Sequence, residues 1–240
     1  MDNQSIIKNY NTCVPDDTFF MNDGYCDFDI NNMPLSVDLK LTDKFLKWKY
    51  QVNLYNKIIN LTDIKNKDID ILDIACGRGG GVSFYKEILN FKNVYGVDIN
   101  PHHIELCKKN CKDISFHTTS AVELPFSNNS MDIITCVEAD SYFRPYENYL
   151  QEVYRILKDD GVFIQTSPYL YQVKFKILKY FKIIKIEDIT NKVGMACAIT
   201  KHLFKNDKKM LNIYSNDEVR YLNGEPMYHI YIMKKCLLND

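Results

Sequence analysis

The deciding stretch of this chain is DIACGRGGG, residues 73–81. The apolar, β-branched run that leads into it predicts a buried parallel strand over 69–74. The glycines allow a tight turn, with positive φ where needed, into a helix at about 79–89. A second apolar run then ends at Asp98, at the spacing where a carboxylate can accept both hydroxyls of a ribose. The stretch therefore predicts a nucleoside-binding unit in an α/β fold.

Two residues separate the nucleotide families that use such a unit. A dinucleotide site of the form Gly-x-Gly-x-x-Gly needs a third glycine at position 82, which is Val82. Asp73 lies four residues before the first glycine, where its charge would repel a pyrophosphate and suit an ammonium group. S-adenosylmethionine carries an ammonium group and an adenosine ribose, so this cofactor is favoured over NAD. The alternatives are an NAD-dependent dehydrogenase and an ordinary glycine turn of an α/β domain.

Length and composition are those of an ordinary globular protein. With 240 residues, 46% of them hydrophobic and 25% charged, the chain can build one large domain with a substantial core. A net charge of −1 argues against nucleic-acid binding. There is no run of about 18 apolar residues, so no membrane span is predicted. The polar start MDNQS does not resemble a signal peptide.

The eight cysteines form no Cys-x-x-Cys pair. Cys107 and Cys111 are four residues apart on a predicted helix, with His103 one turn earlier. Packing cysteines beside a solvent-facing histidine are the commoner arrangement, so no metal site is predicted. Cysteines inside predicted strands and helices indicate a reducing compartment, and the expected location is the cytoplasm.

Strands and helices alternate from residue 69 onward, which is typical of a doubly wound parallel sheet. The predicted strands are 69–74, 94–98, 114–117, 132–137 and 161–167, and the predicted helices are 79–89, 101–111 and 146–157. Two further strands, at 181–186 and 225–233, are separated by a helix at about 190–205 and are expected as a hairpin at a sheet edge.

The first 60 residues have a different character. Residues 1 to about 35 are irregular but rich in aromatic side chains, and apolar residues at helical spacing predict a helix over 42–60. We therefore expect an N-terminal lid segment and helix over 1–60 and a main domain over 61–240, within a single globular unit.

Later blocks of sequence carry a family resemblance. They are ELPF at 123–126, SMDII at 130–134, VEA at 137–139 and EVYRILKDDG at 152–161. In this order and spacing after the glycine turn, they resemble class I S-adenosylmethionine-dependent methyltransferases. FMNDGY at 20–25 and YLNGE at 221–225 are similar to segments of small-molecule methyltransferases of the polyketide and fatty-acid O-methyltransferase type. The resemblance implies a Rossmann-like, doubly wound seven-stranded sheet with its last strand antiparallel, formed by a class I methyltransferase domain over 61–240.

The resemblance also implies roles for residues at the ends of the predicted strands. Asp73 would contact the methionine ammonium, Asp98 the ribose and Ile99 the adenine. The family commonly has Gly-Asp-Ala where this chain has TSA at 119–121, so Ser120 would offer the adenine amino group a neutral acceptor in place of a charged one. The full implied cofactor-binding set is Asp73, Cys76, Gly77, Gly79, Asp98, Ile99, Ser120, Ala121 and Glu138.

The catalytic base is the open question of the sequence. Many relatives have a histidine in the loop after the fourth strand, where this chain has Ser141. Serine is no base at neutral pH, so the candidates are Asp140, if burial raises its pKa, and His229 in the final strand. Asp140 could equally cap the turn that follows it.

The acceptor pocket is expected to be aromatic. The substrate candidates are Tyr25, Trp48, Tyr142, Phe143 and Tyr169, with Tyr171 beside them, and each could instead be lid packing. The expected activity is methyl transfer to a hydroxyl or carboxyl oxygen of a hydrophobic small molecule, such as a polyketide, a fatty-acid derivative or a phenol, by a monomer or homodimer. The alternatives are an N- or C-methyltransferase and a non-methylating cyclase or binding protein on the same fold.

Overall fold

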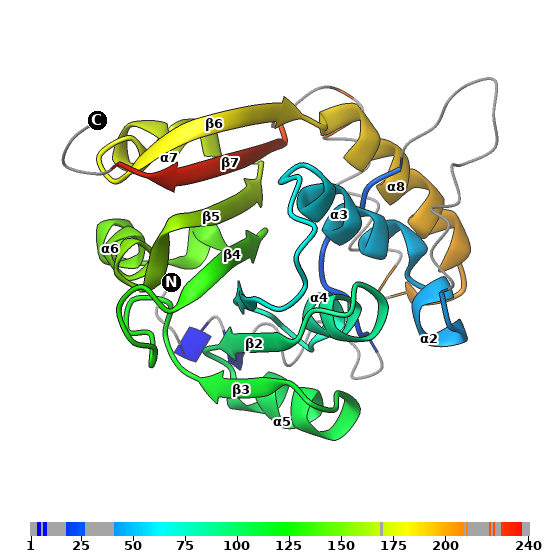
Figure 1. Cartoon of the computed structure of the whole chain (residues 1–240). Coiled ribbons are helices and arrows are strands. Elements are labelled where there is room, and N and C mark those ends of the chain that lie inside the picture. The colour runs from blue at the N-terminus through cyan, green and yellow to red at the C-terminus, as the bar shows by residue number, and fades with distance from the viewer. Residues whose placement is uncertain are drawn as a thin grey trace.

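The computed structural model describes residues 4–5, 7–8, 18–26, 41–168, 170–208, 210, 221, 223 and 227–236. These residues form a layered α/β structure in which helices cover both faces of one seven-stranded sheet (Figure 1). The strand order is β3-β2-β1-β4-β5-β7-β6. The strand that precedes the glycine turn therefore lies inside the sheet, between β2 and β4.

The sheet is mixed, with one strand running against the others. Its strands are β1 (Asp70–Ile74), β2 (Asn93–Asp98), β3 (Ser115–Thr118), β4 (Met131–Val137), β5 (Leu157–Ser167), β6 (Phe181–Asp188) and β7 (His229–Lys235). β7 pairs antiparallel with both β5 and β6, whereas the pairs among β1 to β5 are parallel. The predicted Rossmann-like sheet with an antiparallel last strand is confirmed.

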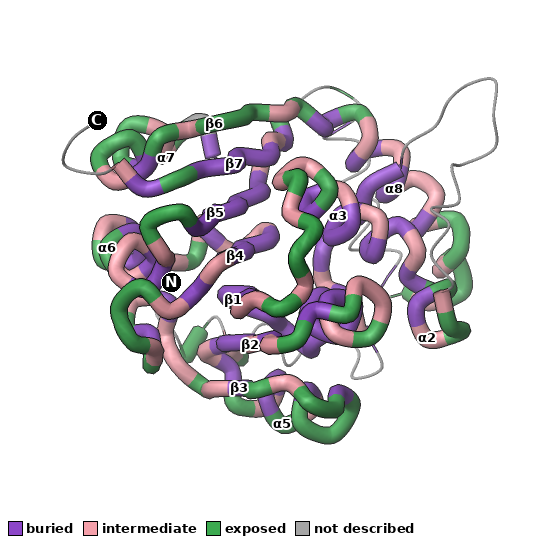
Figure 2. The backbone as a smooth tube through the Cα atoms, viewed as in Figure 1, coloured by how far each residue is buried: buried purple, intermediate pink, exposed green. Residues whose placement is uncertain are grey.

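Helices bury the two faces of the sheet in two apolar clusters. The helical segments are α2 (Asp43–Leu46), α3 (Lys49–Asn60), α4 (Gly80–Ser83), the π-helical η1 (Phe84–Ile88), α5 (Pro101–Asn110), the 3-10 turn η2 (Asp140–Tyr142), α6 (Tyr146–Ile156), α7 (Leu170–Ile177) and α8 (Thr190–Leu203). Residues of α3, α4, α5 and α8 pack with Ile71 and Ile133, and residues of α6 and α7 pack with Leu72 and Ile134. Successive strand residues point to opposite faces, so the central strands are buried on both sides (Figure 2).

Several elements differ from the sequence prediction. The helix expected over 42–60 is divided at Lys47 and Trp48 into α2 and α3, and the helix expected over 79–89 is α4 followed by η1. The sequence patterns do not predict α7. The two closing strands do pair antiparallel at one edge of the sheet with α8 between them in sequence, as predicted, and β7 is the inner of the two, between β5 and β6.

The N-terminal part packs into the same core as the sheet. Phe20, Trp48 and Val52 belong to the apolar cluster that contains Ile71. The division of the chain at residue 60 stays a prediction. None of the described helices is long and apolar enough to cross a membrane.

Candidate functional site

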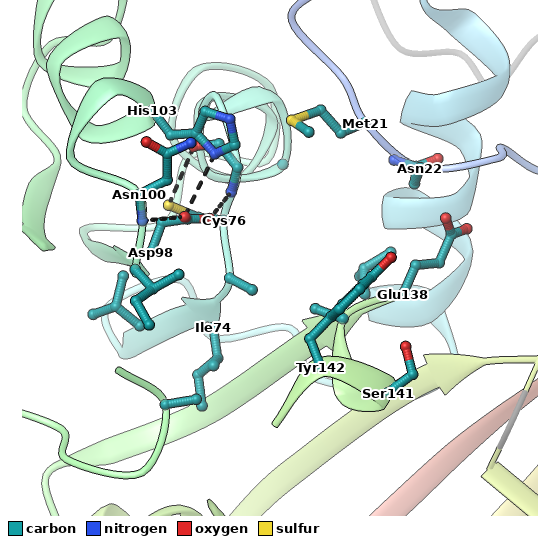
Figure 3. Close-up of a pocket in the computed structure, with 18 of the residues that line it drawn as sticks. Met21, Asn22, Ile74, Cys76, Asp98, Asn100, His103, Glu138, Ser141 and Tyr142 are labelled. Atoms are coloured by element: carbon teal, nitrogen blue, oxygen red, sulfur yellow. Dashed lines mark hydrogen bonds and ion pairs between the residues drawn. The ribbon is translucent and has the colours of Figure 1, made fainter. Parts of the chain in front are cut away.

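A cavity of about 470 Å³ lies where β1, β2 and β4 end (Figure 3). β2 lies on one side of β1 and β4 on the other side. The loops that follow these strands therefore turn away from each other. Such a switch point is the usual ligand site of a doubly wound sheet. The lining residues include 74–77 at the end of β1, 97–100 at the end of β2 and 137–139 at the end of β4, together with residues 18–23 of the N-terminal segment.

The turn after β1 has an unusual backbone. The φ angle is +58° at Ala75, +56° at Gly77 and +88° at Gly79, all in the left-handed region. A side chain at position 77 would meet the sulfur of Met21 at 3.0 Å, so Gly77 keeps the backbone open toward the cavity. Gly79 does not line the described cavity. A side chain there would lie 3.0 Å from Sγ of Cys107, so this glycine allows close packing against α5.

Asp98 is a nearly buried carboxylate on one side of the cavity. The backbone N–H of Gly77 donates to its Oδ2 and that of Asn100 to its Oδ1, both at 2.9 Å, and Nδ1 of His103 lies 3.4 Å from Oδ1. These contacts join the loops after β1 and β2 at one point and fix the carboxylate (Figure 3). A fixed, acceptor-only group of this kind can receive two hydroxyl donors from a ribose.

Cys76, Ile99, Ser120 and Ala121 line the cavity together with Asp98. The hydroxyl of Ser120 accepts a hydrogen bond from the N–H of Val122 at 3.4 Å, which holds the loop after β3. The residues predicted to contact the adenine and the rest of the cofactor therefore line one cavity. Their roles toward a ligand stay a proposal.

Asp73 lies behind the cavity wall rather than on it. Its carboxylate is fully buried and accepts hydrogen bonds from Oγ1 of Thr135 at 2.7 Å and from the hydroxyl of Tyr55 at 3.3 Å. Burial raises the pKa of Asp73 to about 7, and the two hydrogen bonds oppose this rise. Since Tyr55 itself lines the cavity, its hydroxyl connects Asp73 to the cavity.

The pKa of Asp73 predicts a pH dependence of stability. The folded protein keeps this proton up to about pH 7, whereas an unfolded aspartate loses it near its ordinary pKa of about 4. The free energy of unfolding should therefore fall between about pH 4 and 7 and then level off, with up to about 4 kcal/mol from this group. Urea unfolding of the wild type and of Asp73→Asn across this range measures the difference. Identical slopes in the two proteins would contradict the assignment.

Glu138 connects the end of β4 to the N-terminal segment. It has a positive φ of 62°, which is uncommon for a residue other than glycine. Its carboxylate accepts hydrogen bonds from the N–H of Asp23, at 3.0 and 3.1 Å, and from the hydroxyl of Tyr228, and Asp23 in turn accepts one from Tyr221 at 2.8 Å. Glu138 lines the cavity, as expected of a cofactor contact, but these bonds show that it also holds residues 18–26 over it.

The two candidate bases lie elsewhere. Asp140 is 2% exposed, packs beside Ser167 and Gln165, and does not line the described cavity. Burial raises the pKa of Asp140, as a catalytic base would need, but the side chain is enclosed by protein and does not reach the cavity. Asp140 is the first residue of η2, and the backbone N–H of Ser141 donates to its carboxylate, so a role in holding this turn stays a prediction. His229 begins β7, pairs with Ser167 and Asp188, and is also absent from the lining. We retain neither as a catalytic residue.

The candidate acceptor aromatics divide into two groups. Tyr142 and Phe143 line the cavity, and Tyr142 is 40% exposed. Tyr25 and Trp48 are buried in the core instead, because Tyr25 packs on α3 and Trp48 stacks on Phe204 at 5.3 Å between ring centres. Tyr169 and the side chain of Tyr171 lie outside the described residues.

The sequence argument missed Asn22. It is 4% exposed, lines the cavity, and neither atom of its amide has a hydrogen-bond partner among the described residues. Figure 3 places Asn22 with Glu138, Ser141 and Tyr142 on one side of the cavity, and Asp98, Asn100 and His103 on the other. The motif FMNDGY drew attention to this segment, but nothing in the sequence distinguishes its asparagine from an ordinary lid residue.

Comparison with known proteins identifies the central part of the chain. Residues 72–165 match a family described as a methyltransferase domain. The chain is 28% identical over 168 residues to a fatty-acid O-methyltransferase of Mycolicibacterium smegmatis, covering 68% of this chain and 58% of that protein. It is 31% identical over 132 residues to a phthiotriol/phenolphthiotriol dimycocerosates methyltransferase of Mycobacterium tuberculosis, covering 54% and 47%. The chain thus spans about half the length of the curated relatives it matches.

Solved structures share the fold over nearly the whole chain. The cyclase SpnF superposes with a TM-score of 0.74 at 13% identity, covering 98% of this chain and 97% of that one. A geranyl diphosphate C-methyltransferase of Streptomyces coelicolor, solved with S-adenosyl-L-homocysteine, gives 0.72 at 14% identity, covering 97% of each. Residues 72–165 thus resemble a methyltransferase domain, and the chain as a whole shares the fold of these solved structures.

Proposed function

We propose that this protein transfers the methyl group of S-adenosylmethionine to a hydroxyl or carboxyl oxygen of a lipophilic small molecule. One observation supports this most strongly. A single cavity joins a fixed carboxylate beside a left-handed glycine turn to an aromatic wall, so a nucleoside and an apolar acceptor can lie in one space. The names of the curated relatives, which include a fatty-acid O-methyltransferase, point the same way.

The residues present fit the cofactor. Asp98 would accept the ribose hydroxyls, Ile99 and Ala121 would contact the adenine, and the backbone at Gly77, which carries no side chain of its own, would approach the methionine part. The buried carboxyl of Asp73 would favour the cationic end of the cofactor. The charge of Asp98 and the open turn suit a ligand that carries positive charge rather than a pyrophosphate, and a cationic ligand would favour the ionised form of Asp73.

The chemistry asks little of the protein beyond alignment. The cofactor, when bound, supplies a methyl group already activated by the sulfonium, and in-line attack then depends on holding the acceptor oxygen close to it. A carboxylate acceptor needs no base. A hydroxyl acceptor must lose a proton, and on the side of the cavity with Tyr142 the described carboxylates are those of Asp23 and Glu138. His103, the imidazole among the described lining residues, lies beside Asp98 instead.

Asn22 is our candidate for orienting the polar end of the acceptor. A buried amide without a partner costs about 1–3 kcal/mol, and an acceptor oxygen would satisfy it. We expect Asn22→Leu to raise the free energy of unfolding by about 1 kcal/mol, and to raise the KM for the acceptor about tenfold with the Kd for S-adenosylmethionine unchanged. Denaturant unfolding and steady-state kinetics measure both effects.

The exposed Asn110, at the end of α5, gives a matched control. Asn110→Leu should change neither quantity. A loss of stability in Asn22→Leu, or a weaker Kd for S-adenosylmethionine with an unchanged KM for the acceptor, would contradict this role.

The function is tested by offering paired acceptors. A series of fatty acids and the corresponding fatty alcohols is incubated with enzyme and S-adenosylmethionine, and the products are identified by mass spectrometry. Methyl esters or methyl ethers support the proposal and show which oxygen is methylated. Products methylated only at nitrogen or carbon, from a wider acceptor panel, would overturn the assignment to oxygen.

A second candidate is a non-methylating enzyme on the same fold. The superposition on the cyclase SpnF over 98% of this chain and the serine at position 141, where many relatives have histidine, favour it. Cofactor binding without transfer to any acceptor would support this alternative.

We also propose the cytoplasm as the location. None of the seven described cysteines belongs to a disulfide, and six of them are buried. Free thiols in the core are usual in reducing compartments. The net charge of −1 supports the expectation that nucleic acid is no partner, and the proposed assembly is a monomer or homodimer.

A further inference from the structure

Helix α7 and the edge strand β6 carry an unusual concentration of positive charge. Residues 170–186 contain five lysines and neither aspartate nor glutamate, whereas the whole chain balances 30 basic against 31 acidic residues. Among the described residues, only one of these five lysines forms an ion pair, Lys179 with Glu147 at 2.8 Å. In register with them, Lys234 of β7 lies opposite Lys182 and adds a further positive side chain.

The same surface exposes large apolar side chains. Phe175 on α7 is 84% exposed, and Leu178, Ile184 and Ile186 are 45%, 53% and 44% exposed. Leu178, Ile184 and Ile186 line one shallow groove with Lys174, Lys182 and Lys185. We name the four apolar residues and the five lysines the α7–β6 patch. It lies along one edge of the molecule, three strands away from β4 and the cavity (Figures 1 and 2).

The local structure explains how these side chains reach solvent. β6 is the last strand of the sheet, so one of its edges has no neighbouring strand within the part of the chain that the structure describes. The pairing with β7 is irregular between Ile183 and Lys185, which places an extra residue, Ile184, out of the regular alternation. Three successive residues of the strand, Ile184, Lys185 and Ile186, are exposed. The edge of the sheet thus presents both isoleucine and lysine side chains to solvent.

Protection of a sheet edge does not account for the whole patch. Lysines on an edge strand prevent pairing with another strand, and Lys182 and Lys185 serve that purpose. Phe175 and Leu178 lie on or just after α7, where no edge needs protection. Pairing of β6 with a second copy would also bring two rows of lysines together, which like-charge repulsion opposes. A negatively charged partner with an apolar interior fits both the lysines and the exposed apolar groups.

We propose that the α7–β6 patch binds the surface of an anionic lipid bilayer. The lysines contact the lipid headgroups, and Phe175 and Leu178 insert at the boundary between headgroups and acyl chains. This inference does not depend on the proposed methyl transfer, because no residue of the patch lines the cavity.

The test is sedimentation of the full chain with vesicles of phosphatidylcholine, with and without phosphatidylglycerol. We expect binding only to the anionic vesicles, and weaker binding as salt is added. Lys182→Gln with Lys185→Gln should lower the partition coefficient about thirtyfold, since each lysine near such a surface contributes roughly 1 kcal/mol. Phe175→Ser, at a side chain exposed in the free protein, should lower it about tenfold.

The matched control uses Lys108 and Lys109, two exposed lysines of α5 on the opposite side of the sheet (Figure 1). Lys108→Gln with Lys109→Gln removes the same charge and should leave binding unchanged. An equal loss in this control, or equal binding to neutral and anionic vesicles, would overturn the proposal. The proposal would also be overturned if the wild type did not bind vesicles but self-associated in light scattering, and if Phe175→Ser abolished that self-association. The patch would then bind a second copy of this chain.

Discussion

Replacing Asp98 by alanine is expected to weaken S-adenosylmethionine binding by about a hundredfold or more. The ribose hydroxyls would lose two charge-assisted hydrogen bonds to the Asp98 carboxylate, each worth about 1.5–3 kcal/mol. The substitution would also release the N–H groups of Gly77 and Asn100, which the carboxylate holds at 2.9 Å, so the turn beside the ligand would lose its anchor. Calorimetric titration with S-adenosylmethionine measures the effect.

Asp68→Ala is the control for this experiment. Asp68 is exposed, pairs with Lys92 at 2.8 Å, and precedes β1, whose opposite end leads into the cavity. Its loss should leave the affinity within error of the wild type. Unchanged affinity in Asp98→Ala would mean that the ribose lies elsewhere and would contradict the site.

Among substitutions of the turn glycines by alanine, we expect Gly81→Ala to lower the free energy of unfolding most. An added Cβ would lie 2.2 Å from the ring of Tyr55, which is buried in the core and donates to Asp73. The ring cannot move away without breaking that packing, so a loss of about 3 kcal/mol in the free energy of unfolding is expected. Urea unfolding of purified protein measures it.

Ser83→Ala provides the comparison two residues further along. Ser83 is fully buried in α4 and its hydroxyl lies 2.9 Å from Sγ of Cys111, so this change removes one weak hydrogen bond and adds no atom. It should cost about 1 kcal/mol or less. A Gly81→Ala protein as stable as Ser83→Ala would show that Tyr55 is free to move and that the turn is looser than described.

The glycine turn and Asp98 could be predicted because the residues that determine them are close together in the sequence. The strand before the glycines, the turn itself and Asp98 lie within one short stretch, and the apolar periodicity and spacing there have few structural solutions. The position of β7 could not be derived in that way. Its partners are β5 and β6, and whether a last strand forms an edge or inserts depends on contacts over long separations in sequence.

The roles of individual side chains show the same limit. Glu138 was expected at the cofactor because of its place after β4, but its hydrogen-bond partners Asp23 and Tyr228 are 115 and 90 residues away. Tyr25 and Trp48 are aromatic and near the lid, yet both point into the core, because residue type alone does not tell which side of a segment is covered. Asn22 could not be chosen from the sequence, since its importance comes from having no partner where it is buried.

The central claim is that the cavity beside the glycine turn binds S-adenosylmethionine. Calorimetric titration of the wild-type protein with S-adenosylmethionine, followed by competition with S-adenosylhomocysteine and separately with NADH, tests it most directly. The account predicts one saturable site that S-adenosylhomocysteine occupies competitively and NADH does not. Binding of NADH in place of S-adenosylmethionine, or no binding of S-adenosylmethionine at all, would contradict it.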